Sequence, residues 1–87
     1  MNRHIVWKDR ALTDLGDIGR QDQRTAQRIA DAVNRFAELN TGDVKKMAGG
    51  AGEYRLRVGD WRVLFKLEEG GRVLAISRVL NRRDAYR

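Results

Sequence analysis

The chain has 87 residues, of which 41% are hydrophobic and 34% charged, and a formal net charge of +6, which fits one small globular domain over residues 1–87. The chain has no cysteine, which excludes disulfides and thiolate zinc sites, and its one histidine, His4, lies too near the N-terminus to build a His-based metal site or a Ser-His-Asp triad. We therefore expect no metal and no cofactor. No apolar run is long enough for a bilayer and none follows the first four residues as a signal core, so we expect a cytoplasmic protein without a membrane partner.

Residues 3–7, Arg-His-Ile-Val-Trp, form a short apolar run that predicts a strand. Asp9 then precedes three apolar residues spaced three apart, as on one face of a helix: Leu12, Leu15 and Ile18. Gly16 and Gly19 limit this segment. We therefore predict a short helix here.

A longer helix is predicted to begin at Asp22, which is a suitable N-cap. Its apolar positions repeat at three and four residues and indicate a core-facing surface: Ala26, Ile29, Ala30, Val33, Phe36 and Ala37. The opposite face is interpreted as solvated: Arg24, Arg28, Asp31, Asn34, Arg35 and Glu38. The helix is expected to end before Thr41-Gly42-Asp43.

Residues 45–52 are predicted to form a flexible connection, because Gly49, Gly50 and Gly52 lie close together. The segment is not a Walker loop, which needs Gly-Lys-Ser/Thr at the start of a helix, whereas here a strand is predicted next. Lys45 and Lys46 either contact a backbone phosphate or are only solvated.

Residues 54–66 alternate with a period of two around Gly59-Asp60, a two-residue hairpin signal. A two-residue loop pairs Val58 with Trp61, Arg57 with Arg62, Leu56 with Val63, Arg55 with Leu64 and Tyr54 with Phe65. The large apolar residues of these pairs are then predicted to share one face. The other face collects four basic residues: Arg55, Arg57, Arg62 and Lys66.

Arg57 directly across from Arg62 costs stability unless an anion lies between them, which favours a functional site over a merely solvated strand surface. Gly70-Gly71 predicts a second turn. Residues 73–79 are almost continuously apolar and predict a central third strand, which brings residues 81–87 beside the same surface.

The formal charge is segregated along the chain. Residues 1–43 are neutral, and residues 44–87 carry the whole +6. Such segregation favours a polyanion such as nucleic acid, or an acidic protein segment, as the partner. A solvated basic surface is the alternative.

Two stretches carry a family resemblance: residues 54–65, Tyr-Arg-Leu-Arg-Val-Gly-Asp-Trp-Arg-Val-Leu-Phe, and residues 82–87, Arg-Arg-Asp-Ala-Tyr-Arg. They resemble the RelE/ParE superfamily of toxins from bacterial type II toxin-antitoxin systems, on the RelE side. The resemblance implies an α+β fold in which an N-terminal strand and two helices pack on a C-terminal antiparallel β-meander. It also implies a cognate antitoxin as partner, in a toxin-antitoxin hetero-oligomer.

RelE-like members cleave messenger RNA in the ribosomal A site without metal, by attack of a ribose 2′-hydroxyl on the adjacent phosphate. The resemblance therefore implies ribosome and mRNA as partners and the catalytic residues Arg55, Arg57, Arg62, Arg82 and Tyr86. The remaining basic residues of this half are candidates for RNA binding: Lys45, Lys46, Lys66, Arg78, Arg83 and Arg87. Tyr86 either contacts RNA or packs at the C-terminus.

This chain departs from the pattern at Leu80-Asn81, where many relatives carry Gly-His before the Arg-Arg pair. Without that histidine, proton transfer falls to arginine, tyrosine or ribosomal RNA. Two other functions stay open: a ParE-like inhibitor of DNA gyrase, which acts by binding protein, and a basic nucleic-acid-binding module without chemistry.

Overall fold

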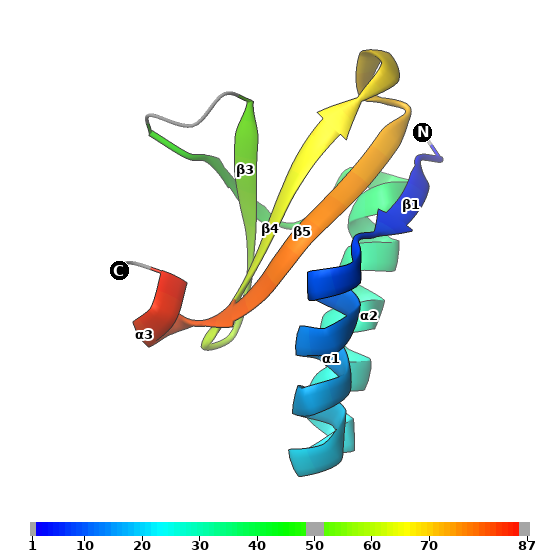
Figure 1. Cartoon of the computed structure of the whole chain (residues 1–87). Coiled ribbons are helices and arrows are strands. Elements are labelled where there is room, and N and C mark those ends of the chain that lie inside the picture. The colour runs from blue at the N-terminus through cyan, green and yellow to red at the C-terminus, as the bar shows by residue number, and fades with distance from the viewer. Residues whose placement is uncertain (1, 49–51, 86–87) are drawn as a thin grey trace.

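Two helices cover one face of a five-stranded mixed sheet (Figure 1). The computed structural model describes residues 2–48 and 52–85. The elements in chain order are β1 (His4–Trp7), α1 (Asp9–Gln21), α2 (Gln23–Leu39), β2 (Asp43–Lys46), β3 (Glu53–Val58), β4 (Trp61–Glu68), the 3-10 turn η1 (Glu69–Gly71), β5 (Val73–Asn81) and α3 (Arg82–Ala85). None of the helices described is both long and apolar enough to cross a bilayer.

The strand order is β1-β5-β4-β3-β2, and every neighbouring pair is antiparallel except β1 with β5, which run parallel. The predicted meander and α+β class are confirmed, and β5 is an inner strand as expected. The prediction of a flexible connection from residue 45 was wrong for Lys45 and Lys46, which belong to β2. Pairing with β3 stabilises this edge strand, whose one apolar residue, Val44, lies opposite Leu56. Gly49 and Gly50 lie outside the described residues.

The first helix is longer than predicted, because α1 continues through Gly16 and Gly19 to Gln21. A methyl group on Gly19 would lie 3.6 Å from the Cβ of Ala26 on α2, so the two helices approach closely at this point. Packing against α2 and β5 thus outweighs the low helix propensity of glycine. The expected apolar face is also corrected: the helix buries Ala11 and Ile18, whereas Leu12 is 51% exposed.

The second helix follows the prediction closely. The Asp22 carboxylate accepts hydrogen bonds from the backbone N–H groups of Arg24 and Thr25 and from the Thr25 hydroxyl, as an N-cap should. All six residues of the face predicted to be solvated are exposed, and the core face buries Ile29, Val33, Phe36 and Ala37. The helix ends at Leu39, and Asn40 follows in the left-handed conformation.

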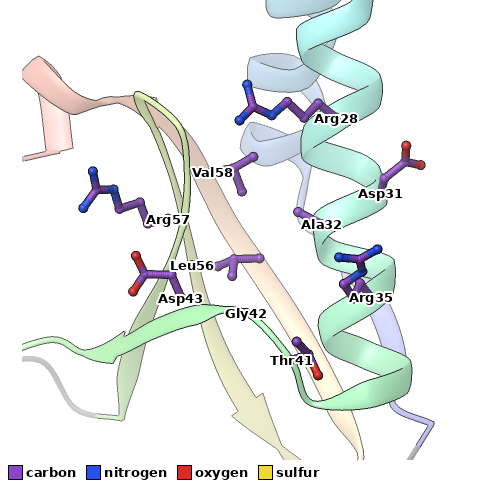
Figure 2. A pocket seen from close by; sticks show the side chains of 10 residues that line it. All are labelled: Arg28, Asp31, Ala32, Arg35, Thr41, Gly42, Asp43, Leu56, Arg57 and Val58. Atoms are coloured by element: carbon purple, nitrogen blue, oxygen red, sulfur yellow. The ribbon is translucent and has the colours of Figure 1, made fainter.

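The register of the β3–β4 hairpin is the predicted one, with Arg57 opposite Arg62 and Val58 opposite Trp61. Gly59 makes the turn with a φ of 61°. Figure 2 shows the resulting alternation: Leu56 and Val58 point toward α2, and Arg57 points away from it. The next strand, β5, runs two residues further than predicted, to Asn81.

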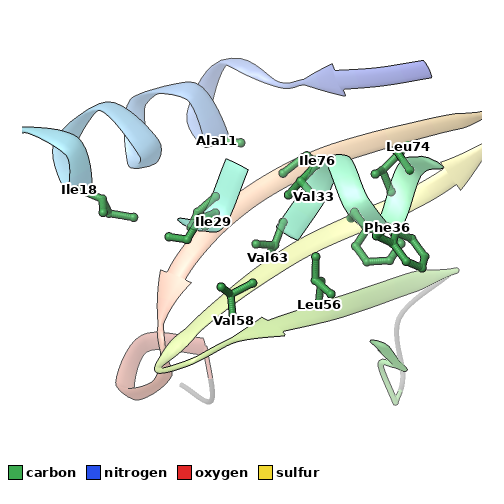
Figure 3. Packing of buried hydrophobic residues seen from close by; sticks show 13 residues of the cluster. Ala11, Ile18, Ile29, Val33, Phe36, Leu56, Val58, Val63, Leu74 and Ile76 are labelled. Atoms are coloured by element: carbon green, nitrogen blue, oxygen red, sulfur yellow. The ribbon is translucent and has the colours of Figure 1, made fainter. Parts of the chain in front are cut away.

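The hydrophobic core lies between the helices and the sheet (Figure 3). Phe65 on β4 is the largest residue of this core that is fully buried, and it is 1% exposed. Its ring stacks on Tyr54 with centroids 5.5 Å apart and meets Phe36 of α2 at 5.3 Å. These contacts fix the apolar face of the hairpin against α2, and therefore fix which side chains face the other way.

Candidate nucleic-acid interface

The face of the sheet that points away from the helices is basic. Strand alternation and the observed registers bring five cationic side chains of β2, β3 and β4 to this face, which we call the basic face: Lys45, Arg55, Arg57, Arg62 and Lys66. Lys45 pairs with Arg55 and Arg57 with Arg62. Directly opposed side chains in a sheet have Cβ atoms about 5 Å apart, so these positive charges repel one another.

Arg62 lies at the end of the basic face next to the β3–β4 turn and is buried, with 4% of its surface exposed. Its Nη1 donates hydrogen bonds to the carbonyl oxygens of Gly59 at 3.1 Å and Trp61 at 3.0 Å. Burial lowers the pKa of Arg62, and the positive charges of neighbouring arginines lower it further, with Asp43 acting in the opposite sense. The guanidinium is thus held in place among like charges, in a position where an anion would be stabilised.

Arg82, at the start of α3, adjoins the same cluster. Its backbone N–H donates to the carbonyl oxygen of Asp60 at 2.6 Å, which fastens α3 to the β3–β4 turn. Its charge is close enough to Arg62 to lower the pKa of that residue. Arg83 is exposed on the same short helix. Tyr86 and Arg87, both named as site residues from the sequence, lie outside the described residues.

Two of the basic residues named from the sequence differ from this cluster. Lys46 lies on the other side of the sheet, whereas Arg78 shares the side of Leu64 by its pairing but has its charge neutralised by an acid. Lys46 pairs with Tyr54, whose ring stacks in the core, so strand alternation turns Lys46 to the helix side of the edge strand. Arg78 is held by Asp14 of α1, in an ion pair of 2.8 Å between Nε and Oδ2 and 3.1 Å between Nη2 and Oδ1.

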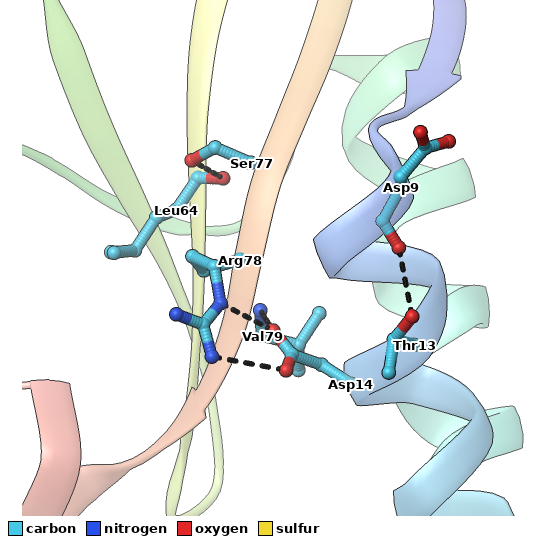
Figure 4. Close-up of polar contacts among 7 residues, drawn as sticks. All are labelled: Asp9, Thr13, Asp14, Leu64, Ser77, Arg78 and Val79. Atoms are coloured by element: carbon cyan, nitrogen blue, oxygen red, sulfur yellow. Dashed lines mark hydrogen bonds and ion pairs between the residues drawn. The ribbon is translucent and has the colours of Figure 1, made fainter.

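Asp14 also completes the edge of the sheet (Figure 4). β1 pairs with β5 only up to Ile76, so the rest of β5 has no strand beside it on that side. There the Asp14 carboxylate accepts a hydrogen bond from the backbone N–H of Val79 at 2.9 Å. Burial raises the pKa of Asp14, but the hydrogen bonds from Arg78 and Val79 and the charges of Arg78 and Arg10 outweigh it, so that the pKa is lowered overall.

Replacing Asp14 with Asn is expected to destabilise the fold by about 1.5–3 kcal/mol, the value of hydrogen bonds to a charged group. Since the folded-state pKa is depressed, the Asp14 contribution is complete above the unfolded-state value near 3.9 and is lost as the pH falls through the folded-state value. Urea unfolding of both proteins at pH 7 and at acid pH measures this. The difference between them should be constant from about pH 5 to 8 and shrink below about pH 4.

Asp17→Asn is the matched control, since Asp17 lies one turn later on α1. Its side chain is 55% exposed, so its ion pair with Arg20 contributes little to the stability of the fold. An Asp14 variant no less stable than the Asp17 variant would contradict the role given to Asp14.

Chemically, the basic face is suited to binding and stabilising phosphate oxygens. No group of histidines or carboxylates able to hold a metal ion occurs among residues 2–48 and 52–85. The one histidine of the chain, His4, lies on β1, with β5 and β4 between it and β3.

Sequence reasoning missed Asp43, which pairs with Arg57 on the basic face. The signal available in the sequence was its spacing of two residues from Lys45, which places the two side chains on one face of a strand.

Comparisons with known proteins agree with this fold. The family model described as the ParE toxin of the type II toxin-antitoxin system parDE matches residues 5–86. No curated protein matches the sequence.

Three solved structures illustrate the similarity in fold. A chain of the toxin-antitoxin complex RelBE2 from Mycobacterium tuberculosis has a TM-score of 0.79 at 18% identity and covers 94% of this chain and 93% of its own. The YoeB/ParE toxin from Agrobacterium tumefaciens has a TM-score of 0.77 at 19% identity, and the match covers 90% of this chain and 96% of that toxin. A chain of the chromosomal ParDE system from P. aeruginosa has a TM-score of 0.72 at 14% identity, and the match covers 91% of this chain and 95% of its own.

Proposed function

Because the chain belongs to the ParE toxin family, within the RelE/ParE superfamily of type II toxin-antitoxin systems, we propose that it is a toxin of the ribonuclease kind. It is a toxin whose partner is a cognate antitoxin. The proposed activity is ribosome-dependent cleavage of messenger RNA by attack of a ribose 2′-hydroxyl on the adjacent phosphate, with the 5′-oxygen of the next nucleotide as leaving group. No metal ion takes part in this scheme.

The observation that carries the proposal is the clustering of arginines around the buried Arg62. Negative charge grows on the phosphate oxygens as the 2′-oxygen attacks, and cations already in position stabilise that charge without reorganising. The mutual repulsion of Arg57 and Arg62 in the absence of an anion is relieved when a phosphate lies between them.

The proposed roles follow from position. Arg62 stabilises the phosphorane, Arg55 and Arg57 bind its oxygens from the neighbouring strand, and Arg82 holds the phosphate or the leaving group. Tyr86 stacks on a base or orients the 2′-hydroxyl. Arginine is a poor general acid because its guanidinium keeps its proton throughout the physiological pH range, so proton transfer is assigned to tyrosine or ribosomal RNA. Further phosphate contacts are proposed for Lys45, Lys66, Arg83 and Arg87. They are not proposed for Lys46, which turns to the helix side of β2, or for Arg78, which is held by Asp14.

Toeprinting on programmed ribosomes tests the proposal. The wild-type chain is expected to produce cuts within the A-site codon, and the same message without ribosomes should stay intact. Since the reaction needs no metal of its own, the cuts should persist when free divalent cations are lowered to the level that just keeps ribosomes assembled. An intact message in the presence of a folded, growth-arresting toxin would overturn the ribonuclease proposal.

Inhibition of DNA gyrase is the second candidate, and the description of the matching family model as ParE favours it. A gyrase inhibitor acts by binding protein and needs no cluster of arginines preorganised for phosphate chemistry. A supercoiling assay with purified gyrase separates the two candidates: blocked supercoiling with intact message assigns the chain to the second one.

A further inference from the structure

One carboxylate lies next to the arginines of the basic face. Asp43, the first residue of β2, is opposite Arg57 of β3, which is itself opposite Arg62 of β4, so the three residues form one row across the sheet. Figure 2 shows the side chains of Asp43 and Arg57 on the same side of their strands, pointing away from α2. Asp43 is exposed, and its negative charge opposes the lowering of the pKa of Arg62 by burial and by the neighbouring arginines.

The Asp43 carboxylate is open to a ligand. Within residues 2–48 and 52–85 it takes part in no ion pair and no hydrogen bond. It lies one and a half strand spacings, about 7 Å, from the midpoint between Arg57 and Arg62, where the proposed function places the phosphate. A nucleotide whose phosphate lies between the arginines therefore has another of its parts beside Asp43.

The chemistry of a carboxylate decides which part of the nucleotide that is. An ionised carboxylate only accepts hydrogen bonds, so it repels phosphate oxygens and pairs with N–H or O–H donors. The 2′-hydroxyl that attacks the phosphate is adjacent to it, and thus lies beside the arginines rather than one strand further away. The remaining donors of a nucleotide within an RNA strand are on the edge of its base, which single-stranded RNA leaves open to a protein.

Among the four bases, guanine matches a carboxylate best. Its Watson–Crick edge presents two adjacent donors, the ring N–H and the amino group, and the two carboxylate oxygens can accept from both at once. Cytosine and adenine offer only an amino group, beside a ring nitrogen acceptor that a carboxylate repels. Uracil has a single N–H between two carbonyl oxygens and is matched worst.

We propose that Asp43 is a specificity-determining residue, which reads a guanine next to the phosphate held by Arg57 and Arg62. The substrate class is then RNA with guanine beside the cleaved bond, with cytosine and adenine cut less well and uracil least. The arginines position the RNA through its phosphate, and Asp43 makes the contact that depends on the base. This inference rests on the proposed ribonuclease function, because it takes the anion on the basic face to be an RNA phosphate.

The test measures a ratio of two affinities on the whole folded chain. The probes are guanosine 3′,5′-bisphosphate and uridine 3′,5′-bisphosphate, which carry phosphates on both sides of the nucleoside and differ only in the base. NMR titration of the isotope-labelled chain follows the Nε–H signals of Arg57 and Arg62. The guanosine compound is expected to bind about fivefold or more tightly than the uridine compound, the lower part of the range for a bidentate contact to one base.

A third probe tests the contact on the unaltered chain. Inosine 3′,5′-bisphosphate lacks only the amino group of the guanosine compound, so it offers one donor where guanine offers two. It should lose most of the preference over the uridine compound. An inosine compound that binds as tightly as the guanosine compound would contradict a contact to both donors.

Asp43→Asn separates base reading from general electrostatics. Removing a negative charge from the basic face should tighten the binding of both bisphosphates, but the preference for guanosine should fall to within about twofold. An amide has one accepting and one donating side, so it cannot accept from both guanine donors. Glu53→Gln is the matched control and should keep the preference, because Glu53 shares the face of Arg57 but pairs with Lys66 at the far end of β3. The amide spectrum of each variant reports whether it is folded; if one is not, the three probes on the wild-type chain still decide.

Cleavage on programmed ribosomes gives a second readout. Among A-site codons that differ in one base, those with guanine beside the cleaved bond should be cut about fivefold or more faster than those with uracil. Asp43→Asn should remove this difference, and Glu53→Gln should keep it.

The outcomes distinguish this inference from the proposed function. Equal affinity for the guanosine and uridine compounds would overturn the inference, as would a guanosine preference that Asp43→Asn keeps. If Asp43 only neutralises Arg57, the variant changes both affinities by the same factor. Cuts without any codon preference would retain the ribonuclease function and remove the base contact. A guanosine preference that is lost in Asp43→Asn, together with an intact message on ribosomes, would support the base contact and overturn the ribonuclease function.

Discussion

Arg62→Ala is expected to lower the rate of A-site cleavage about 100-fold to 1000-fold, the loss found when one preorganised charge-stabilising donor is removed. Arg62 is 4% exposed and held by the carbonyl oxygens of Gly59 and Trp61, so its guanidinium is fixed in place before any substrate binds. Single-turnover cleavage on programmed ribosomes measures the rate. Binding to ribosomes should change far less, because the exposed basic residues are kept.

A second variant separates catalysis from folding. Arg62→Lys keeps the charge and loses the planar fork of donors, so it should recover only part of the rate. The melting temperature of Arg62→Ala should stay near the wild-type value, since removing a buried charge also removes its repulsion with Arg57. Arg24→Ala, on α2, is the control for loss of one positive charge. A rate loss in Arg62→Ala matched by an equal loss of folded protein would mean that Arg62 only supports the turn.

Phe65→Ala is expected to cost about 3–5 kcal/mol of unfolding free energy, the largest effect on stability that we predict. The side chain is 1% exposed, stacks on Tyr54 and contacts Phe36, so its removal leaves a cavity between the sheet and α2. A small domain has only about 5–15 kcal/mol in total, so the melting temperature should fall by roughly 15 °C or more. Urea unfolding followed by circular dichroism checks this.

Leu12→Ala provides the comparison for Phe65→Ala. Leu12 is 51% exposed on α1, and its truncation should change stability by no more than about 0.5 kcal/mol. Equal losses in the two variants would show that the core is not centred on Phe65.

The sequence is most informative where structure depends on neighbouring residues. Alternation around Gly59-Asp60 predicts the β3–β4 register correctly, and with it the common face of Arg55, Arg57 and Arg62. Asp22 is recognisable as an N-cap for the same reason, since its partners lie two and three residues away. The catalytic role of the arginines stays a prediction, because the register establishes their placement and not their chemistry.

The features that could not be predicted depend on distant parts of the chain. α1 extends through Gly16 and Gly19 because α2 and β5 pack against it, and β2 forms because β3 offers a partner. Arg78 reads from the sequence as one more cation of a basic strand. Its partner Asp14 is 64 residues away, and no local pattern links the two.

The parallel pairing of β1 with β5 has a consequence for synthesis. His4 pairs with Val73, so the first strand made has to wait for a partner that is translated roughly 70 residues later. The arginines of β3, β4 and α3 likewise share one surface only after nearly the whole chain has left the ribosome. A nascent chain therefore lacks this shared surface until β3, β4 and α3 have all been made and packed together.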